Sequence, residues 1–191
     1  MRALVFEEGG RPKVADLPEP ELGPGEALLE VRLSGICGTD LELSRGYMAF
    51  KGVPGHEFVG TVLEVRSPAD RPLLGARMAG EINLGCLDCP LCAEGLARHC
   101  PQRKVLGILD RQGVHAERVA LPVSNLRAVP ENLSDEEAVF IEPVAAACEI
   151  LDQMTPGPRQ RLLVLGDGRL GLLVSQVMLT TGAKVTLAGH H

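Results

Sequence analysis

The sequence has few aromatic residues and no tryptophan. Aromatic residues make up 3% of the 191 residues, whereas hydrophobic residues make up 45%. The core must therefore be aliphatic, built on valine, leucine, isoleucine and alanine. This composition is typical of a globular protein and excludes a disordered chain. A chain of this length accommodates one sizeable domain, or one domain and part of another, and we expect the second arrangement.

The chain also lacks an excess of positive charge and long apolar runs. The formal net charge is -6 and the isoelectric point is near 5.4, whereas a nucleic acid or an anionic membrane would favour a basic face. No apolar run approaches the ~20 residues that cross a bilayer. The apolar start of the chain is too short for a signal peptide. We therefore expect a cytoplasmic protein that binds neither nucleic acid nor membrane.

Cysteine is present in a pattern that suggests metal. The chain has six cysteines, and in a cytosolic protein these indicate metal binding or catalysis before disulfides. Four thiolates can close all four corners of one zinc ion and leave no open position. We predict such a structural zinc, with two disulfides or an iron–sulfur cluster as the alternatives. The four predicted ligands are Cys86, Cys89, Cys92 and Cys100.

A second group of residues suits a catalytic zinc, which keeps one position open for water or substrate. Cys37 and His56 can supply two ligands. The third candidate is Glu142, because a carboxylate in the apolar segment 138–147 is costly unless a partner or a metal takes its charge. Taken singly, each has an ordinary alternative, such as an inert buried cysteine. A metalloprotease is excluded because Gly60 stands where its helix needs a second histidine.

Hydrophobic patterning predicts strands in the first part of the chain and a strand–helix–strand unit at its end. Ser134 and Glu137 have the spacing of a capping box that opens a helix, and Pro143 either ends that helix or starts the next one. The predicted elements are strands at 3–6, 27–33, 58–65, 161–165 and 184–188, a turn at Gly9-Gly10, a short helix capped by Thr39, and a helix at 172–181.

A glycine-rich loop stands between the strand at 161–165 and the helix after it. In this setting the pattern is the dinucleotide fingerprint, in which the helix N-terminus receives a pyrophosphate. NAD-selecting folds place an acid about 20 residues further on, whereas Ala188-Gly189-His190-His191 stands here, which favours NADP. Gly189 to His191 could equally begin a purification tag, which would remove that argument. The predicted cofactor residues are Gly166, Gly168, Leu170 and Gly171.

Taken together and in order, these features resemble the zinc-dependent alcohol dehydrogenases of the medium-chain dehydrogenase/reductase superfamily. Glu142 in place of a third cysteine resembles the polyol, threonine and sugar dehydrogenase branch. The resemblance implies an α+β fold, with a GroES-like zinc-bearing β domain at 1–150 and the first β-α-β unit of a Rossmann α/β domain at 151–191. The features that carry it are Cys37-Gly38-Thr39-Asp40, Gly55-His56-Glu57, the four cysteines, Glu142-Pro143 and the loop from Gly166 to Gly171.

The same resemblance implies roles for the site residues. Cys37, His56 and Glu142 would bind the catalytic zinc, with Glu57 beside the metal and able to replace its water. Thr39 would bond the substrate hydroxyl and pass its proton outward, and Asp40 would hold the second nitrogen of His56. The implied reaction moves a hydride from a small alcohol or polyol to NAD(P), while zinc lowers the pKa of the alcohol. It also implies two zinc ions per chain and a homo-oligomer in the full-length form.

Besides the missing acid after the glycine loop, two features depart from the family pattern. The sequence stops after one strand–helix–strand unit, so we expect a fragment or truncated product. The alternative function is a catalytically incomplete, zinc-stabilised fragment or interaction module. His115 stands where relatives tend to have an aromatic residue, and we expect it to be a wall or surface residue that alters the pocket rather than a ligand. A zinc-free quinone reductase of the same superfamily is disfavoured by Cys37 and the four cysteines.

Overall fold

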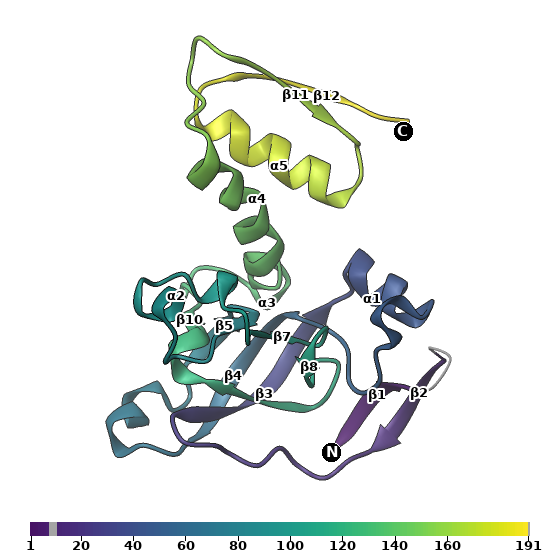
Figure 1. Ribbon diagram of the computed structural model, residues 1–191, viewed down its shortest axis with the longest axis vertical. Coiled ribbons are helices and arrows are strands. Elements are labelled where there is room, and N and C mark those ends of the chain that lie inside the picture. The colour runs from purple at the N-terminus through teal and green to yellow at the C-terminus, as the bar shows by residue number, and fades with distance from the viewer. Residues whose placement is uncertain (8–10, 191) are drawn as a thin grey trace. The chain divides into compact units, whose positions relative to one another are not determined.

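The computed structural model describes residues 1–7 and 11–190 (Figure 1). The turn predicted at Gly9-Gly10 lies outside the described residues, as does His191. The chain forms two compact units, Met1–Val139 and Phe140–His191, here called unit 1 and unit 2.

Unit 1 is built around a five-stranded antiparallel sheet with the strand order β10-β5-β4-β3-β9. Its two longest strands coincide with strands that alternating hydrophobicity predicts, at 27–33 and 58–65. These strands pair with each other, and the pairing fixes where their flanking loops meet. The strands are β3 (Glu26–Gly35), β4 (Glu57–Val65), β5 (Arg77–Gly80), β9 (Arg118–Pro122) and β10 (Leu126–Ala128).

The core of unit 1 lies against this sheet and is almost entirely aliphatic. Phe58 is the one aromatic ring in the central cluster of buried residues described, and Leu29 and Leu121 pack in the same cluster. Burying a side chain of this size contributes about 1.5–3 kcal/mol. The aliphatic core expected from the low aromatic content is confirmed.

Smaller elements surround the sheet. The strands are β1 (Arg2–Phe6) and β2 (Pro12–Asp16), which form a hairpin, and β6 (Asn83–Leu84), β7 (Lys104–Leu106) and β8 (Asp110–Arg111), which form a second sheet. The helices are α1 (Gly38–Ser44), α2 (Pro90–Ala93) and α3 (Asp135–Ala138). Short 3-10 turns cover Tyr47–Ala49, Pro68–Leu73, Ala97–His99 and Val123–Asn125.

Two helix starts test the sequence analysis. The capping box of Ser134 and Glu137 opens α3 and is confirmed, with Glu137 N donating to Ser134 Oγ over 3.2 Å. The predicted cap Thr39 is wrong, because α1 begins one residue earlier and Cys37 is its N-cap. Cys37 has extended backbone angles, and its N–H donates to the Asp40 side chain at the third helical position over 2.9 Å.

Unit 2 contains α4 (Ile141–Gln153), β11 (Arg161–Leu165), α5 (Arg169–Thr180) and β12 (Lys184–Ala188). The strands pair in parallel and α5 connects them, which gives the predicted β-α-β unit (Figure 1). Pro143 lies in the first turn of α4, where its missing N–H needs no partner. Because α4 packs against α5, it groups with unit 2. The domain boundary at 150/151 stays a prediction.

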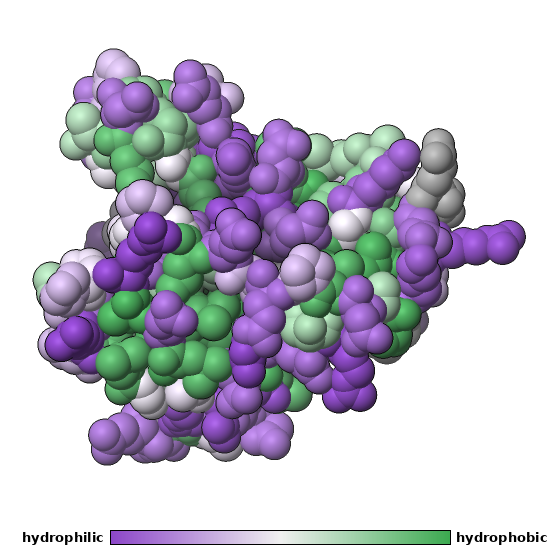
Figure 2. Space-filling view, turned by 90° about the horizontal axis from the view of Figure 1, so that it is seen from below, coloured by the Kyte–Doolittle hydropathy of each residue, from purple (hydrophilic) through white to green (hydrophobic). Residues whose placement is uncertain are grey.

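The surface is mixed in character. Figure 2 shows hydrophilic residues interspersed with hydrophobic patches over the face that it displays. None of the helices in the described part of the chain combines the length and the hydropathy that a membrane span requires.

Candidate metal centres and cofactor loop

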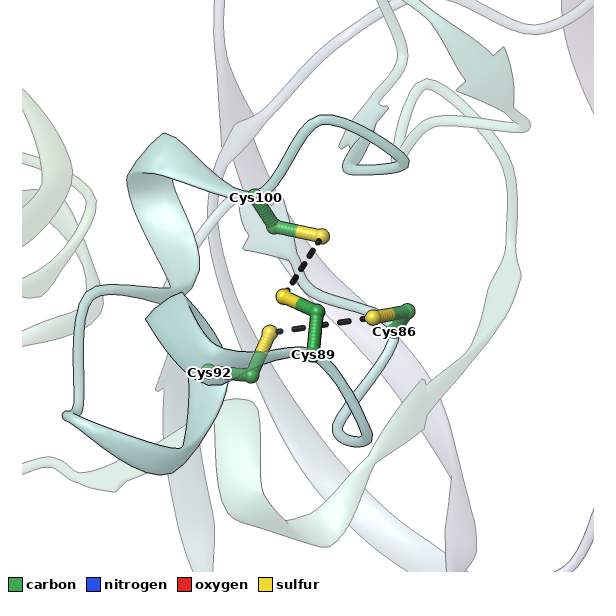
Figure 3. A group of neighbouring side chains, drawn as sticks. All are labelled: Cys86, Cys89, Cys92 and Cys100. Carbon is green, nitrogen blue, oxygen red and sulfur yellow. Dashed lines mark hydrogen bonds between the residues drawn. The ribbon is translucent and has the colours of Figure 1, made fainter.

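The first candidate centre is the lobe of Cys86, Cys89, Cys92 and Cys100, whose sulfur atoms all lie within 4.8 Å of one another. Figure 3 shows the four side chains converging, with sulfur–sulfur distances of 4.0 Å for Cys86 and Cys92 and 3.8 Å for Cys89 and Cys100. A tetrahedral ion with Zn–S bonds of about 2.3 Å needs sulfurs roughly 3.8 Å apart. The lobe therefore has the donors and spacing of a structural zinc site.

Local chain features hold this lobe together. Pro90 starts α2, so Cys89 stands at the N-cap and Cys92 lies within the helix. A Cβ at residue 85 would lie 2.7 Å from Cys92 Sγ, so glycine there leaves room for the sulfur. All four cysteines are free thiols in the structure. Disulfides need sulfurs about 2.05 Å apart, so the geometry favours metal.

The thiols of the lobe have divergent proton affinities. A hydrogen bond with the Asp88 side chain raises the pKa of Cys86 to about 12. Hydrogen bonding from the backbone of Cys86 lowers the pKa of Cys100 to about 7. Thiolates are the form that binds zinc, so metal binding releases protons from this lobe.

The second candidate centre joins Cys37, His56 and Glu57, whose donor atoms also lie within 4.8 Å of one another. Cys37 follows β3 and His56 precedes β4. The antiparallel pairing places Gly35 opposite Glu57, which brings the two loops together. His56 is buried at 3% exposure, and burial raises the pKa of the Cys37 thiol. A thiol, an imidazole and a carboxylate at this spacing fit the ligands that zinc takes at a catalytic site.

Asp40 connects the two loops of this centre. It is 3% exposed, and it accepts hydrogen bonds from Cys37 N over 2.9 Å and from Gly55 N over 3.1 Å. Burial alone would raise the pKa of Asp40, but the His115 ring, the Cys37 N–H and the charge of His56 outweigh it and lower that pKa. Asp40 Oδ1 lies 3.8 Å from His56 Nδ1, longer than a hydrogen bond. The hydrogen bond from His56 to Asp40 that the resemblance implies is therefore not formed at this distance.

Thr39 and Glu57 both lie close to Cys37, and their roles stay predictions. Thr39 Oγ1 is 3.7 Å from Cys37 Sγ. A Cβ at Gly35 would lie 2.4 Å from a Glu57 carboxylate oxygen, so only glycine leaves room for that side chain in its present position. Glu142 is the second residue of α4 and belongs to unit 2. Its role as a zinc ligand stays a prediction.

The cofactor loop has the geometry of the dinucleotide fingerprint. Gly166 has a φ of 107°, which side chains rarely adopt, and its N–H donates to Ala188 O over 2.8 Å. A Cβ at Gly171 would lie 1.9 Å from Gly166 O, so the helix can approach the loop only with glycine there. Gly168 is the N-cap of α5, and Leu170 lies exposed in its first turn. The first N–H groups of α5 suit a pyrophosphate.

Asp167, in the glycine-rich loop after β11, lies beside Gly189, the residue that follows β12. The sequence analysis did not predict this closeness. A Cβ at Gly189 would lie 2.1 Å from Asp167 Oδ1, so the Asp167 carboxylate occupies the space beside the strand end. A carboxylate here would repel a 2′-phosphate. The preference for NADP stays a prediction, and this contact works against it.

His115 is the site residue that the sequence analysis missed. Its side chain is 9% exposed, and its Nε2 lies 3.5 Å from Asp40 Oδ2. It was expected at a wall or on the surface because its neighbours in sequence give no sign of contact with Asp40. The available signal is the histidine itself, a polar ring directly after the buried Val114.

A groove of about 880 Å³ on unit 1 is lined partly by the segments 17–21, 48–53 and 108–113. It contains none of the candidate zinc ligands. The metal centres are therefore identified by their donor atoms and not by a cavity.

Comparison with known proteins decides the family. The model of the alcohol dehydrogenase GroES-like domain family matches residues 23–131, which is more than half of the chain. The chain belongs to this family. The match includes Cys37, His56 and the four-cysteine lobe. It confirms the GroES-like β domain and the predicted place among the zinc-dependent dehydrogenases of the medium-chain superfamily.

Individual relatives agree with this membership. L-threonine 3-dehydrogenase of Chelativorans sp. (strain BNC1) is 35% identical over 176 residues, covering 88% of this chain and 50% of that protein. The crystal structure of a short chain alcohol dehydrogenase (rspB) from Escherichia coli CFT073 with NADH has a TM-score of 0.94 and 30% identity, covering 100% of this chain and 57% of that one.

A zinc-binding dehydrogenase from Sinorhizobium meliloti 1021, solved with NADP, has a TM-score of 0.86 and 33% identity, covering 100% of this chain and 56% of that one. The chain spans about half the length of the curated relatives it matches.

Proposed function

We propose that this chain is part of a zinc- and NAD(P)-dependent dehydrogenase that oxidises a small alcohol or polyol. The observation that carries the proposal is the meeting of Cys37, His56 and Glu57 at the paired ends of β3 and β4. A structural zinc alone would need only the four-cysteine lobe. The dinucleotide loop of unit 2 and the relatives that act on L-threonine or bind NADH and NADP support the same reaction class.

Each residue of this centre has a part in the reaction. Cys37 and His56 would hold the zinc, with Glu57 or Glu142 as the carboxylate ligand. Bound zinc supplies Lewis acidity that lowers the pKa of an alcohol. Thr39, whose hydroxyl lies 3.7 Å from Cys37 Sγ, would accept the alcohol proton and pass it to solvent. Asp40 holds the two loops together by accepting hydrogen bonds from the backbone N–H groups of Cys37 and Gly55.

The test is the zinc content of the chain with and without Cys37. The proposal expects two zinc ions per wild-type chain, and one in Cys37→Ser, with loss of turnover and an unchanged circular dichroism spectrum. One zinc per wild-type chain, bound only by the four cysteines, would remove the catalytic centre. Cys148→Ser is a matched control, because it makes the same substitution at an exposed cysteine that forms no part of either centre.

A second candidate is a zinc-stabilised interaction module without turnover. Its supporting observation is that β11 and β12 form a sheet of two strands, in which every second residue is exposed. Titration with NADH and NADPH separates the two candidates, because saturable binding is expected of a dehydrogenase and not of such a module. Assembly into a homo-oligomer and a cytoplasmic location stay predictions of the full-length protein.

A further inference from the structure

Two buried side-chain nitrogens in the described residues lack a hydrogen-bond partner, and both face Asp40. They are His56 Nδ1, 3.8 Å from Asp40 Oδ1, and His115 Nε2, 3.5 Å from Asp40 Oδ2. An unsatisfied buried polar group costs about 1–3 kcal/mol. Two such groups around one carboxylate indicate a polar network that is close to forming its hydrogen bonds.

The Asp40 carboxylate has a symmetrical set of neighbours. Oδ1 accepts from Gly55 N and faces the His56 ring, whereas Oδ2 accepts from Cys37 N and faces the His115 ring. An ionised carboxylate offers about four acceptor positions. Two backbone N–H groups and two imidazole N–H groups would fill all four. His115 is thus as close to this carboxylate as the candidate zinc ligand is.

Ser34 orients the His115 ring. Its Oγ lies 3.0 Å from His115 Nδ1. A neutral imidazole has one donor and one acceptor nitrogen, and a carboxylate can only accept. The arrangement that satisfies both contacts places the proton on Nε2, facing Asp40, and lets the Ser34 hydroxyl donate to Nδ1.

The backbone around His115 is fixed to the loop that carries His56. Gly113 N donates to Val53 O over 2.7 Å and His115 N donates to Pro54 O over 3.0 Å. The His115 ring lies directly on Gly55, where an added Cβ would be 2.7 Å from His115 Cγ. The ring is therefore packed against the residue that immediately precedes His56.

From these contacts we propose that His115 is a positioning residue of the centre formed by Cys37 and His56. Its Nε2 faces Asp40 Oδ2 over 3.5 Å and donates to it when the ring closes that gap, and Asp40 holds the backbone of Cys37 and Gly55 at the separation that metal binding needs. This rests on the proposed function, because it assumes that the centre binds metal. His115 is not itself a ligand here, since its ring nitrogens face Ser34 and Asp40.

The test substitutes His115→Phe, which keeps a flat ring on Gly55 and removes both nitrogens. We expect the affinity of the Cys37 centre for Co²⁺ and Zn²⁺ to fall 10- to 100-fold. The four-cysteine lobe should bind as in wild type and serves as the control within the same molecule. Titration of the metal-free chain with Co²⁺ separates the two centres, because four thiolates give a stronger charge-transfer absorbance than one.

Two further variants separate the hydrogen bond from the packing. His115→Gln keeps a donor near Asp40 and should recover part of the lost affinity. Ser34→Ala removes the group that orients the ring and should cause a smaller loss at the same centre. The matched control is Ser44→Ala, because the hydroxyl of the half-buried Ser44 donates within its own helix, to Leu41 O, and this variant should bind metal as wild type does.

Each outcome decides one point. Unchanged affinity at the Cys37 centre of His115→Phe overturns the positioning role and leaves the proposed function intact. If His115→Phe weakens both centres, Ser34→Ala decides: a loss confined to the Cys37 centre supports the role, and no loss overturns it. A wild-type chain that binds one metal ion, in the four-cysteine lobe alone, overturns the proposed function and this role with it.

Discussion

The two metal centres of unit 1 are assembled in opposite ways. The four-cysteine lobe takes all its donors from one short segment, 86–100. The short helix α2 and the 3-10 turn Ala97–His99 bring these donors together. The Cys37 centre takes its donors from two segments that meet because β3 pairs with β4 and because Asp40 bonds to both loops. The first centre is therefore encoded locally, and the second depends on the sheet.

Because of this difference, we expect the lobe to contribute to the stability of the fold and the Cys37 centre to contribute to the reaction. A closed set of four thiolates leaves no position for a substrate, so its zinc contributes folding free energy. The Cys37 centre has a mixed donor set and a network of backbone and imidazole contacts through Asp40. Small shifts of either loop would change its metal affinity. Substitutions should therefore affect the two centres separately.

The largest expected effect comes from the lobe. In Cys100→Ser one buried ligand is lost, and the structural zinc should be released because three thiolates bind it far more weakly. We expect the Tm to fall by about 10 °C or more, since each kcal/mol is worth about 2–4 °C in a chain of this size. Differential scanning calorimetry measures it. Cys148→Ser, at an exposed cysteine outside the lobe, is the control and should leave the Tm unchanged.

A substitution at Gly55 should affect stability and the Cys37 centre together. Gly55 has a φ of 96°, and an added Cβ would lie 2.7 Å from the His115 ring. Gly55→Ala should cost about 1–3 kcal/mol and weaken metal binding at the Cys37 centre. Urea unfolding and Co²⁺ titration measure the two effects. Gly46→Ala is the control, because it has the same φ of 96° with no atom near its Cβ. Equal metal affinity in both variants would contradict the account.

Gly35→Ala tests the place of Glu57. The new methyl group would lie 2.4 Å from the Glu57 carboxylate, which must turn away. Since a side chain can move more easily than backbone, we expect a stability loss of about 1 kcal/mol or less and a change in the Co²⁺ spectrum of the Cys37 centre. An unchanged spectrum would show that Glu57 does not contact the metal. Gly38→Ala, with open space around its Cβ, is the comparison.

The smallest expected effect on the two metal centres comes from a contact remote from both. Hydrogen bonds from Arg77 and then Arg32 lower the pKa of Asp135. A lowered folded-state pKa stabilises the protein above the unfolded value of about 3.9, and this contribution is lost as the pH falls through the folded pKa. Asp135→Asn should cost about 1–2 kcal/mol at pH 7 and little at pH 2–3. Urea unfolding at both pH values measures this.

The outcome that would contradict the Asp135 prediction is an equal loss of stability at neutral and acid pH. Glu42→Gln is the control, because the exposed pair of Glu42 and Arg45 should contribute less than about 0.5 kcal/mol. Metal content should stay at the wild-type value in both variants.

The sequence predicted what is encoded locally. The spacing of the four cysteines, the glycines of the cofactor loop and the alternation of β3 each depend on neighbouring residues, and the structure has these features as predicted. The predicted N-cap of α1 was wrong by two residues. Threonine is a common N-cap residue, which favoured Thr39, whereas helix-capping preferences give no sign of the hydrogen bond from Cys37 N to Asp40.

The contacts of His115 could not be predicted from the sequence. His115 reaches Asp40 only because the segment 113–115 bonds to the segment 53–55. Nothing in either segment specifies that register. The same holds for Gly189, whose closeness to Asp167 depends on the pairing of β11 with β12. The four cysteines converge as their spacing predicts, whereas the contact of His115 with Asp40 was not predicted, and the metal ligands of both centres stay predictions.

The most direct test of two differently built centres is zinc K-edge X-ray absorption of the zinc-loaded chain. The account predicts two zinc ions per chain and an average of about 2.5 sulfur ligands per zinc, with nitrogen or oxygen ligands in the remainder. In Cys37→Ser the average should rise to about 4, as only the lobe stays loaded. A wild-type chain with one zinc bound by sulfur alone would contradict it.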